Sequence, residues 1–583
     1  MPAPTVPVEW ELPRLRYSLT FQDDGRYADE VGPDTEFFDV KFYPYSPPGS
    51  NPVFAAVSKR HIFICRLTQT KDANPCEIIR VIRDDDDDAL NCSCTWTKDP
   101  VTERALLCVA GRDAKVKVYN VRDGEAVASF VGHGGEINDL ATSPANPYLV
   151  ASASDDTTVR IWSLNPVHKE QPCVCLLGGE GHSWNLLSVA FHDTGRYVLS
   201  AGHDQVINLW TLPDIPDEHM EVPNIVHFPH FSSSEIHTGL IDCVAFYGDM
   251  ILSRACYEEV IVLWRIEGFD SSAPPPTPEQ APSNQDATKV TRSAFNTPPP
   301  TSSHTSSAAL VSSTPQYTRL LQLDTPGCGP QFFMRFGLFN MAGHHPTLAF
   351  CNATAKIYFW DFTCFSAYRD FVKACARRDR ESRAGGQDSE GPVPRPPWLR
   401  IVAAKKRPTN SGYPGSAAHL PGGRRLRDAS GPGLGMRDSA DRADPGSDRD
   451  SSVFSSVPGA GAAGMGTPDP DSAVAASSSA NGPSRLGRNS AHSLGSGFTI
   501  KDVYNTETVE DWSSRYNTDD PHTRVKAHKV ETTKGLSAVG RQVAWSPEGE
   551  WCVVVGSNSR LMILHRWAKG DAHTVEDGEQ HAA

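Results

Sequence analysis

The chain has 583 residues, of which 39% are apolar and 21% are charged, and its formal net charge is -15 at pH 7. No stretch approaches the ~18 consecutive apolar residues of a membrane span, and the opening MPAPTVPVEW lacks the basic start and apolar run of a signal peptide. We therefore expect neither membrane insertion nor secretion. The acidic balance argues against direct sequence-specific or broad nucleic-acid binding, which needs clustered Lys and Arg, and it suits a basic partner.

The fourteen cysteines contain no CxxC pair. Cys92/Cys94 and Cys173/Cys175 are CxC pairs inside strand-like runs, where a period of two places both sulfurs on one face. This pattern favours packing over zinc binding. We expect no metal, no cofactor and a reducing intracellular compartment.

Four parts of the chain are predicted to lie outside any core. They are the tails 1–30 and 571–583, the Pro/Ser/Thr-rich linker 269–316 and the Gly/Ser/Ala/Pro-rich insertion 383–499. Segments of this composition bury too little apolar surface to offset the entropy of ordering, so we expect the linker and the insertion to be disordered. The basic clusters between 405 and 488 fit either a solvated linker or a nuclear-import patch.

The remaining segments, 31–268, 317–382 and 500–570, are rich in short β-like runs. These include VFAAV, IFICRL, LLCVA, KVKVYNV, YLVASAS, TVRIW, YVLSAG, VINLW, VIVLW, KIYFW, WCVVVG and LMILH. Helical periodicity is sparse and is strongest at 365–382. The sequence therefore predicts an all-β fold.

The β-like runs repeat. In each repeat an apolar strand ends on an aromatic residue, and a turn acid stands six residues earlier, as in Asp113/Tyr119, Asp156/Trp162 and Asp204/Trp210. A Gly-His pair precedes two of these acids by 23 and 22 residues. The pattern resembles the WD40 family. That resemblance implies structural struts, in which the turn acid accepts a hydrogen bond from the histidine beside the tryptophan: His133, Asp156 and Trp162, and His182, Asp204 and Trp210.

The ends of these strands fall at positions 65, 119, 162, 210, 264, 360 and 564. The first four gaps are 54, 43, 48 and 54 residues, close to the ~40–45-residue period of the repeat. Each of the two longer gaps is one period plus an insertion. We predict a seven-bladed β-propeller with blades 1–5 in 31–268, blade 6 in 317–382, and the end of blade 6 with blade 7 in 500–570.

Aligning the innermost strand of each repeat predicts which residues surround one mouth of the central channel. They are Phe38, Cys92, Asn138, Leu187, Asp242, Phe332 and Arg541, and Phe333 follows Phe332. Facing aromatic rings can hold a methylated lysine by cation–π contacts of ~0.5–2 kcal/mol each. In the alternative interpretation, which the pattern alone favours, the three phenylalanines plug the channel as core.

Several stretches resemble a narrower family. FFDVKF, FVGHGGEIND, LLGGEGH, HFPHFSSSEIHTGLIDCVAF, DMILSRAC, QFFMRF and GRQVAWS are similar to the embryonic ectoderm development or extra sex combs subunit of Polycomb repressive complex 2. The resemblance implies a non-catalytic nuclear scaffold that reads trimethyl-lysine on a histone H3 tail. It also implies that the chain binds and stimulates an enhancer-of-zeste histone methyltransferase together with other subunits, in transcriptional repression.

Carried over residue by residue, the resemblance places the methyl-lysine cage at Phe38, Cys92, Phe332 and Phe333, with Asp242 and Arg541 beside the peptide. The family has tyrosine, tryptophan and tyrosine where this chain has Cys92, Phe332 and Phe333. We therefore expect a weaker or remodelled cage, for which Trp184 is one possible compensation. The acidic run 84–88 is either a solvated loop or an attraction for a basic tail.

Two other classes of protein compete with this interpretation. A generic WD40 adaptor, such as a ubiquitin-ligase receptor, would lack selectivity for methyl-lysine. An enzyme is not expected, because the sequence has no nucleophile elbow, phosphate loop or metal-spaced His/Cys set.

Overall fold

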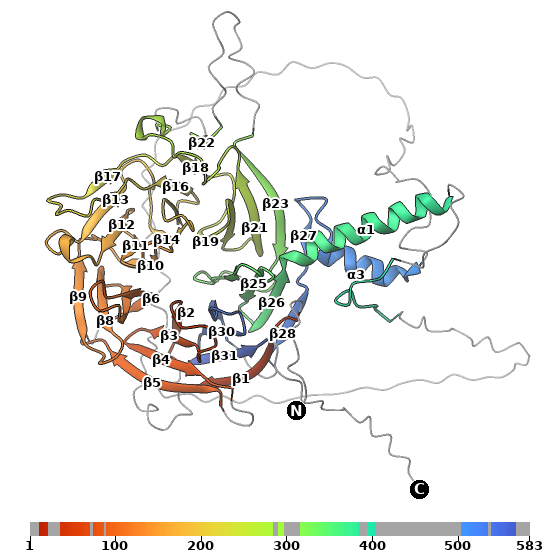
Figure 1. Ribbon diagram of the computed structural model, residues 1–583, viewed down its shortest axis with the longest axis horizontal. Helices are drawn as coiled ribbons and strands as arrows, with labels where there is room; N and C mark the ends of the chain where they lie inside the picture. Colours follow the sequence, from red (N-terminus) through yellow and green to blue (C-terminus); the bar gives the residue numbers. More distant parts are fainter. Residues whose placement is uncertain are drawn as a thin grey trace, which may run out of the picture. The chain divides into compact units, whose positions relative to one another are not determined.

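The computed structural model describes residues 11–20, 35–69, 74–86, 89–283, 290–296, 315–383, 393–403, 503–533 and 538–566. Within them, seven sheets are arranged around a ring (Figure 1). The expectations for 1–10, 571–583 and most of 383–499 fall outside the described residues.

Blades 1 to 3 follow one another along the chain, and each has four antiparallel strands. Blade 1 consists of β2 (Phe37–Phe42), β3 (Val53–Ser58), β4 (His61–Leu67) and β5 (Cys76–Arg83). Blade 2 consists of β6 (Asn91–Lys98), β7 (Ala105–Gly111), β8 (Lys115–Asn120) and β9 (Ala126–Val131). Blade 3 consists of β10 (Ile137–Thr142), β11 (Leu149–Ser154), β12 (Val159–Ser163) and β13 (Cys173–Leu177), and β17 (Asn224–Val226) adds a parallel fifth strand.

Blades 4 and 5 also take a fifth strand from a later part of the chain. Blade 4 consists of β14 (Leu186–Phe191), β15 (Tyr197–Gly202), β16 (Ile207–Thr211) and β18 (Phe231–Ser233), followed by β22 (Thr291–Ser293). Blade 5 consists of β19 (Ile241–Tyr247), β20 (Met250–Ala255), β21 (Val260–Ile266) and β23 (Tyr317–Asp324), followed by the parallel β27 (Arg524–Val525).

Both chain ends contribute to the closure of the ring. Blade 6 consists of β24 (Gly337–Phe339), β25 (Thr347–Cys351), β26 (Lys356–Asp361) and β28 (Lys529–Thr532). Blade 7 consists of β29 (Gly540–Trp545), β30 (Trp551–Gly556), β31 (Arg560–His565) and β1 (Arg14–Thr20). Because β1 pairs antiparallel with β31, the first and last strands share one sheet and join the ends of the chain.

Each of the seven interfaces between neighbouring blades has its own hydrophobic cluster. Between blades 7 and 1, for example, Phe54 and Phe63 pack with Val553 and Ile563. Strands such as β30 (WCVVVG) are buried along their whole length because both faces meet a neighbouring sheet. β-branched and aromatic side chains suit such two-sided burial, which is why these runs form strands.

Within the described residues, the α-helices are α1 (Phe362–Arg383) and α3 (Thr506–Tyr516), which lie beside the ring at blades 5 and 6 (Figure 1). Two 3-10 turns cover Pro166–His168 and Pro278–Gln280. Asn505 caps α3 by accepting a hydrogen bond from the Thr508 N–H at 2.7 Å. The buried residues of α3 recur every four positions, as an amphipathic helix requires: Thr508, Trp512 and Tyr516.

The structure corrects four of the predicted boundaries. Residues 14–20, assigned to a tail, form β1, because Leu19 enters the core between blades 7 and 1. Residues 317–324, assigned to blade 6, are β23 of blade 5, since they pair with β21. Part of the 269–316 linker belongs to blade 4, where the rings of Phe269 and Phe295 lie 5.1 Å apart. Part of the 383–499 insertion also packs, with Leu399 completely buried against the two helices.

Candidate functional site: one mouth of the propeller

The predicted struts of blades 3 and 4 form two equivalent buried networks. In blade 4, His182 Nδ1 lies 2.9 Å from the Asp204 carboxylate, and the Ser200 hydroxyl lies 2.7 Å from His182 Nε2 and 2.8 Å from Trp210 Nε1. The corresponding set of blade 3 is His133, Asp156, Ser152 and Trp162. Burial would raise the pKa of Asp204, but the hydrogen bond and charge of His182, together with the Ser183 and Val206 N–H groups, outweigh burial and lower that pKa. These groups hold the blades and do not face a ligand.

Sequence reasoning missed a third network, in blade 5. His237 Nδ1 lies 2.6 Å from Glu258, and Ser253 Oγ contacts both His237 Nε2 and Trp264 Nε1. Burial opposes ionisation of Glu258, but hydrogen bonds led by His237 lower its pKa to about 2. The sequence did contain a signal, because His237 stands 21 residues before Glu258. The network was missed because His237 lacks the glycine that usually precedes such a histidine.

A β-bulge places the predicted mouth residues at equivalent points of six blades. The pairing register shifts at one residue near the start of each innermost strand. The bulged residues are Phe38, Cys92, Asn138, Leu187, Asp242 and Arg541. Bulges at the rim of a ring re-aim a side chain, so the alignment made from sequence corresponds to a repeated structural feature. Blade 6 differs, because β24 begins only at Gly337.

Phe332 and Phe333 form an aromatic pair in the segment before β24. Their ring centroids lie 5.0 Å apart with an interplanar angle of 37°, and both side chains are partly exposed. Phe333 has φ 55°, in the left-handed region that a bulky residue rarely adopts. A backbone conformation of this kind costs about 1–3 kcal/mol and persists only where its surroundings impose it. Phe38, in contrast, is only 8% exposed.

Arg541 holds the backbone of the aromatic pair. Its guanidinium donates to the Phe332 carbonyl at 2.5 Å and to Glu36 at 2.6 Å. It therefore ties blade 6 to the segment that enters blade 1, and it is not sealed off from solvent.

Cys92 and Asn138 connect neighbouring blades. The Cys92 thiol is 6% exposed and lies 3.1 Å from the Ile137 carbonyl, and burial raises its pKa well above the ordinary value. Asn138 donates to Asp155 at 2.7 Å and to the Leu186 carbonyl at 2.8 Å. No aromatic ring occupies the Cys92 position.

The structure corrects the expectation that Asp242 lies beside a bound peptide. Its side chain is completely buried and forms an ion pair with Arg254, which is also completely buried. Asp242 also accepts a hydrogen bond from the Met334 N–H at 3.1 Å, two residues after Phe332. It thus neutralises a buried charge beneath the mouth and presents no surface to a peptide.

Beneath Phe333 lies a charged network that sequence reasoning did not reveal. Arg335 lies under the Phe333 ring at 5.5 Å and bonds to Asp139 at 2.9 Å, and to the Asn138 and Leu187 carbonyls across the channel. Lys41 adds a second cation, 3.4 Å from Asp39. Burial would lower the pKa of Lys41, but Asp39 and Asp139 reverse this and raise it. The sequence did contain a signal for this network. Lys41 and Arg335 occupy the same position of the innermost strand in blades 1 and 6, where the other blades have alanine or threonine.

The wall on the side of blades 3 and 4 combines aromatic and acidic groups. The Trp184 ring lies 5.8 Å from His203, and His203 lies 6.4 Å from Phe332. Burial lowers the pKa of His203, while the charges of Asp155 and Asp204 oppose that effect. The sequence suggests Trp184 as a compensating ring, but it does not point to His203, which stands beside a strut acid.

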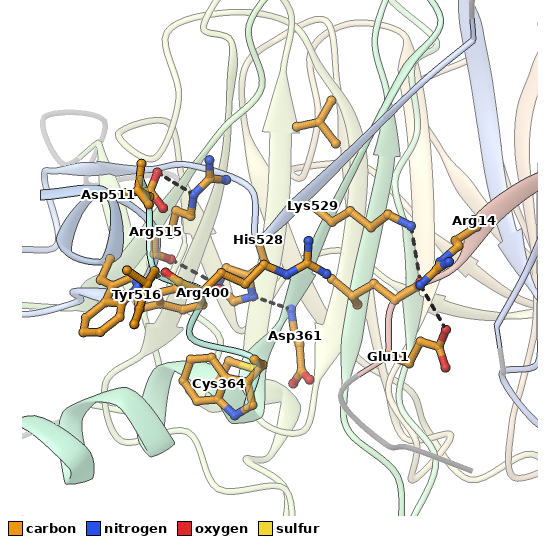
Figure 2. Close-up of a pocket in the computed structure, with 16 residues that line it drawn as sticks. Glu11, Arg14, Asp361, Cys364, Arg400, Asp511, Arg515, Tyr516, His528 and Lys529 are labelled. Carbon is orange, nitrogen blue, oxygen red and sulfur yellow. Dashed lines mark hydrogen bonds and ion pairs between the residues drawn. The ribbon is translucent and has the colours of Figure 1, made fainter. Parts of the chain in front are cut away.

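A separate cavity of about 900 Å³ lies between β1, β28 and the two helices. In Figure 2, Glu11 and Arg14 lie on one side, Asp511 and Tyr516 lie on the other, and His528 is between them. Burial lowers the pKa of His528 to about 3; its Nδ1 accepts from the Asp361 N–H, and its Nε2–H donates to the Arg515 carbonyl, each at 3.0 Å. The neutral imidazole is thus a packing element between the helices and blade 6.

The described part of the chain contains no cluster of three or more His, Cys, Asp or Glu side chains placed to hold a metal ion. Among the described helices, none is long and apolar enough to cross a membrane.

These features define a class of protein, the seven-bladed WD40 propeller, and the family model described as "WD domain, G-beta repeat" matches residues 124–163 and 173–211. The chain is 50% identical to the Polycomb protein EED of Chaetomium thermophilum over 585 residues, covering 96% of this chain and 97% of the relative. It therefore belongs to the Polycomb protein EED family, which confirms the resemblance seen in the sequence, and it is a non-catalytic subunit.

Other relatives agree with this assignment. The chain is 32% identical to the Polycomb protein esc of Drosophila melanogaster over 206 residues, which cover 32% of this chain and 47% of the relative. A chain in the crystal structure of the Chaetomium thermophilum polycomb repressive complex 2 matches with a TM-score of 0.72 and 47% identity, over 96% of this chain and 99% of that one. The same values hold for a structure of that complex with H3K27me3.

Proposed function

We propose that this chain is the propeller subunit of a nuclear Polycomb repressive complex 2. In this role it binds an enhancer-of-zeste type histone methyltransferase and other subunits of the complex, and it acts in transcriptional repression. The family assignment over nearly the whole chain supports the proposal, as does the likeness to chains of solved complexes.

The proposed ligand of the mouth is trimethyl-lysine of a histone H3 tail. A trimethylammonium group cannot donate hydrogen bonds, so ring faces recognise it through cation–π contacts. The observation that carries the proposal is the Phe332–Phe333 pair, which is partly exposed and held with Phe333 in an uncommon backbone conformation.

The other predicted cage residues take different parts in this proposal. Phe38 supplies a third wall, of which only an edge is exposed. Cys92 occupies the fourth position without a ring, so the site loses one cation–π contact of ~1–2 kcal/mol and binds about five- to thirtyfold more weakly than a complete cage. Arg541 flanks the peptide and fixes Phe332 through its carbonyl.

Binding at the mouth is further proposed to stimulate the methyltransferase. If the marked tail favours the active arrangement of the bound partner, the partner must in turn favour binding of the tail by the same factor. This chain contributes no reacting group to methyl transfer.

The test is a titration of the full chain with an H3K27me3 peptide and its unmodified counterpart. We expect tighter binding of the trimethylated peptide, and Phe333→Ala should weaken it about five- to thirtyfold with little change for the unmodified peptide. Tyr257→Ala, an exposed aromatic on blade 5, is the matched control. Equal binding of both peptides would remove the reader assignment.

A second measurement concerns the complex. The chain with Phe333→Ala should still co-purify with the methyltransferase, but the H3K27me3 peptide should no longer raise the rate of methyl transfer. Retained stimulation in this variant would refute the link between the mouth and the partner.

A further inference from the structure

Trp184 is an exposed aromatic side chain beside the mouth. It is 54% exposed, and among the described residues only Trp184 and Tyr257 are aromatic side chains with more than half of their surface in solvent. Trp184 follows His182 in the segment that leads into β14. A single exposed ring needs no special explanation, whereas an exposed aromatic surface that continues from one ring to the next marks an interaction site.

The ring of Trp184 continues the aromatic surface of the cage. Trp184 lies 5.8 Å from His203 with an interplanar angle of 36°, and His203 lies 6.4 Å from Phe332 at 75°. The His203 N–H donates to the Asn185 carbonyl at 2.8 Å, which ties the His203 turn to the Trp184 segment. Trp184, His203, Phe332 and Phe333 therefore form one row from blade 4 to blade 6, in which each ring contacts the next.

The charges around this row favour a cation. His203 lies in the field of Asp155 and Asp204, and burial holds its pKa below the usual value, so the ring is neutral at physiological pH. The Trp184 and His203 rings form a neutral aromatic surface beside carboxylates, which we call the shelf. It suits a guanidinium, which is planar, weakly hydrated and stacks on indole faces. A lysine ammonium is more strongly hydrated and fits such a shelf less well.

The size of the row limits where such a group stands in a peptide. The Trp184 and Phe332 centroids are at most about 12 Å apart, a distance that about four extended residues span. We propose that Trp184 and His203 form a second subsite, which stacks an arginine within about four residues of the methylated lysine. This inference rests on the proposed function, because the cage anchors the peptide.

The experiment is a double-mutant cycle between the full chain and synthetic peptides. Each peptide carries one trimethyl-lysine and one arginine placed one to four positions away on either side, and its partner peptide has alanine for that arginine. We expect Trp184→Ala to weaken binding about five- to thirtyfold for at least one arginine position, and not for the alanine peptides. Trp184→Phe should restore part of the loss, since a ring remains.

Two controls separate a subsite from a general effect. Tyr257→Ala removes an exposed aromatic from the β20–β21 turn of blade 5 and should leave every affinity unchanged. Quenching of Trp184 fluorescence, measured as the signal lost in Trp184→Phe, should accompany binding of the arginine peptides. A thermal melt of Trp184→Ala that matches the parent chain excludes misfolding as the cause of any loss.

The outcomes distinguish failure of the subsite from failure of the cage. If Phe333→Ala weakens every trimethylated peptide but Trp184→Ala weakens the arginine and alanine peptides equally, or not at all, the subsite is refuted and the cage stands. If Phe333→Ala changes nothing while Trp184→Ala acts only on arginine peptides, the cage is refuted and the shelf is an independent arginine site.

Discussion

The polar networks inside the blades and the aromatic row at the mouth solve opposite problems. In the strut networks of blades 3, 4 and 5, the histidine and the tryptophan each bond to a serine of the same blade, as burial of polar groups requires. At the mouth, Phe332, Phe333 and Trp184 keep apolar surface in solvent, and Phe333 has a strained backbone. The buried networks stabilise the folded state. The exposed rings and the strained backbone at the mouth reduce its stability and leave an aromatic surface open to a ligand.

This difference leads to a simple expectation. Changes in the buried networks should reduce the free energy of unfolding and affect all ligands alike. Changes at the mouth should leave the melting temperature nearly constant and alter the affinity for particular peptides. Asp242, Cys92 and Glu136 test the division because they stand at the boundary between the two regions.

The largest effect is expected for Asp242→Ala. The substitution leaves Arg254 buried without its partner, and removal of one member of a buried ion pair costs about 3–5 kcal/mol. Chemical denaturation should therefore show a large loss of stability. If the Asp242→Ala protein were stable but selectively lost peptide binding, Asp242 would contact the peptide. That result would contradict its assignment as a buried stabilising group.

The double variant Asp242→Ala/Arg254→Met supplies the control. Removing both charges abolishes the unpaired cation, so we expect much of the lost stability to return. A double variant as unstable as Asp242→Ala would show that packing, and not charge, accounts for the effect.

The parts of the fold that could be predicted are those written in local sequence. The six-residue step from a turn acid to a strand-ending aromatic lies within one hairpin, so the repeat count and the inner-strand alignment both followed from it. β1, β22 and β27 could not be predicted in the same way. Each joins its sheet through a partner far away in the chain, such as Arg14 opposite His565, and no local pattern encodes that pairing.

The candidate site could be predicted only where it follows from the repeat. The alignment of the repeats gives the bulge positions and places Phe332 and Phe333 at the mouth. It does not give the side chains of other blades that contact these two rings. Arg335 reaches across the channel to Asp139, and His203 reaches Phe332 from another blade. Contacts of this kind depend on the diameter of the closed ring, which the sequence does not state.

A smaller effect is expected for Cys92→Tyr, which restores a ring at the fourth cage position. We expect the affinity for the trimethylated peptide to rise by up to about five- to thirtyfold, at a cost of about 1–3 kcal/mol in stability because Cys92 is packed. Cys92→Leu is the matched control, since it adds bulk without a ring. Equal affinities in the two variants would indicate that the position does not face the ligand.

The smallest effect is expected from the ionisation of Glu136, which precedes Ile137, the acceptor of the Cys92 thiol. Burial raises the pKa of Glu136 to about 7, the charge of Asp155 adds to the rise, and Arg112 opposes it. The carboxyl is therefore mainly neutral below pH 7 and anionic above it. A cationic peptide at the mouth should bind severalfold more tightly at pH 8 than at pH 6.5, and Glu136→Gln should flatten this profile.

The stability of the chain should change in the opposite direction over part of this range. An unfolded Glu136 ionises near its ordinary value of 4.5, whereas the folded one keeps its proton up to about pH 7. The unfolded state thus binds fewer protons between these values, and the free energy of unfolding falls as the pH rises. Tighter binding at higher pH cannot then be a consequence of a more stable propeller.

His203 adds little to the pH dependence of binding above pH 6.5, because burial lowers its pKa. Asp155→Asn should lower the midpoint of the binding profile, and an unchanged midpoint would mean that the carboxylates of blade 3 do not act on the ligand.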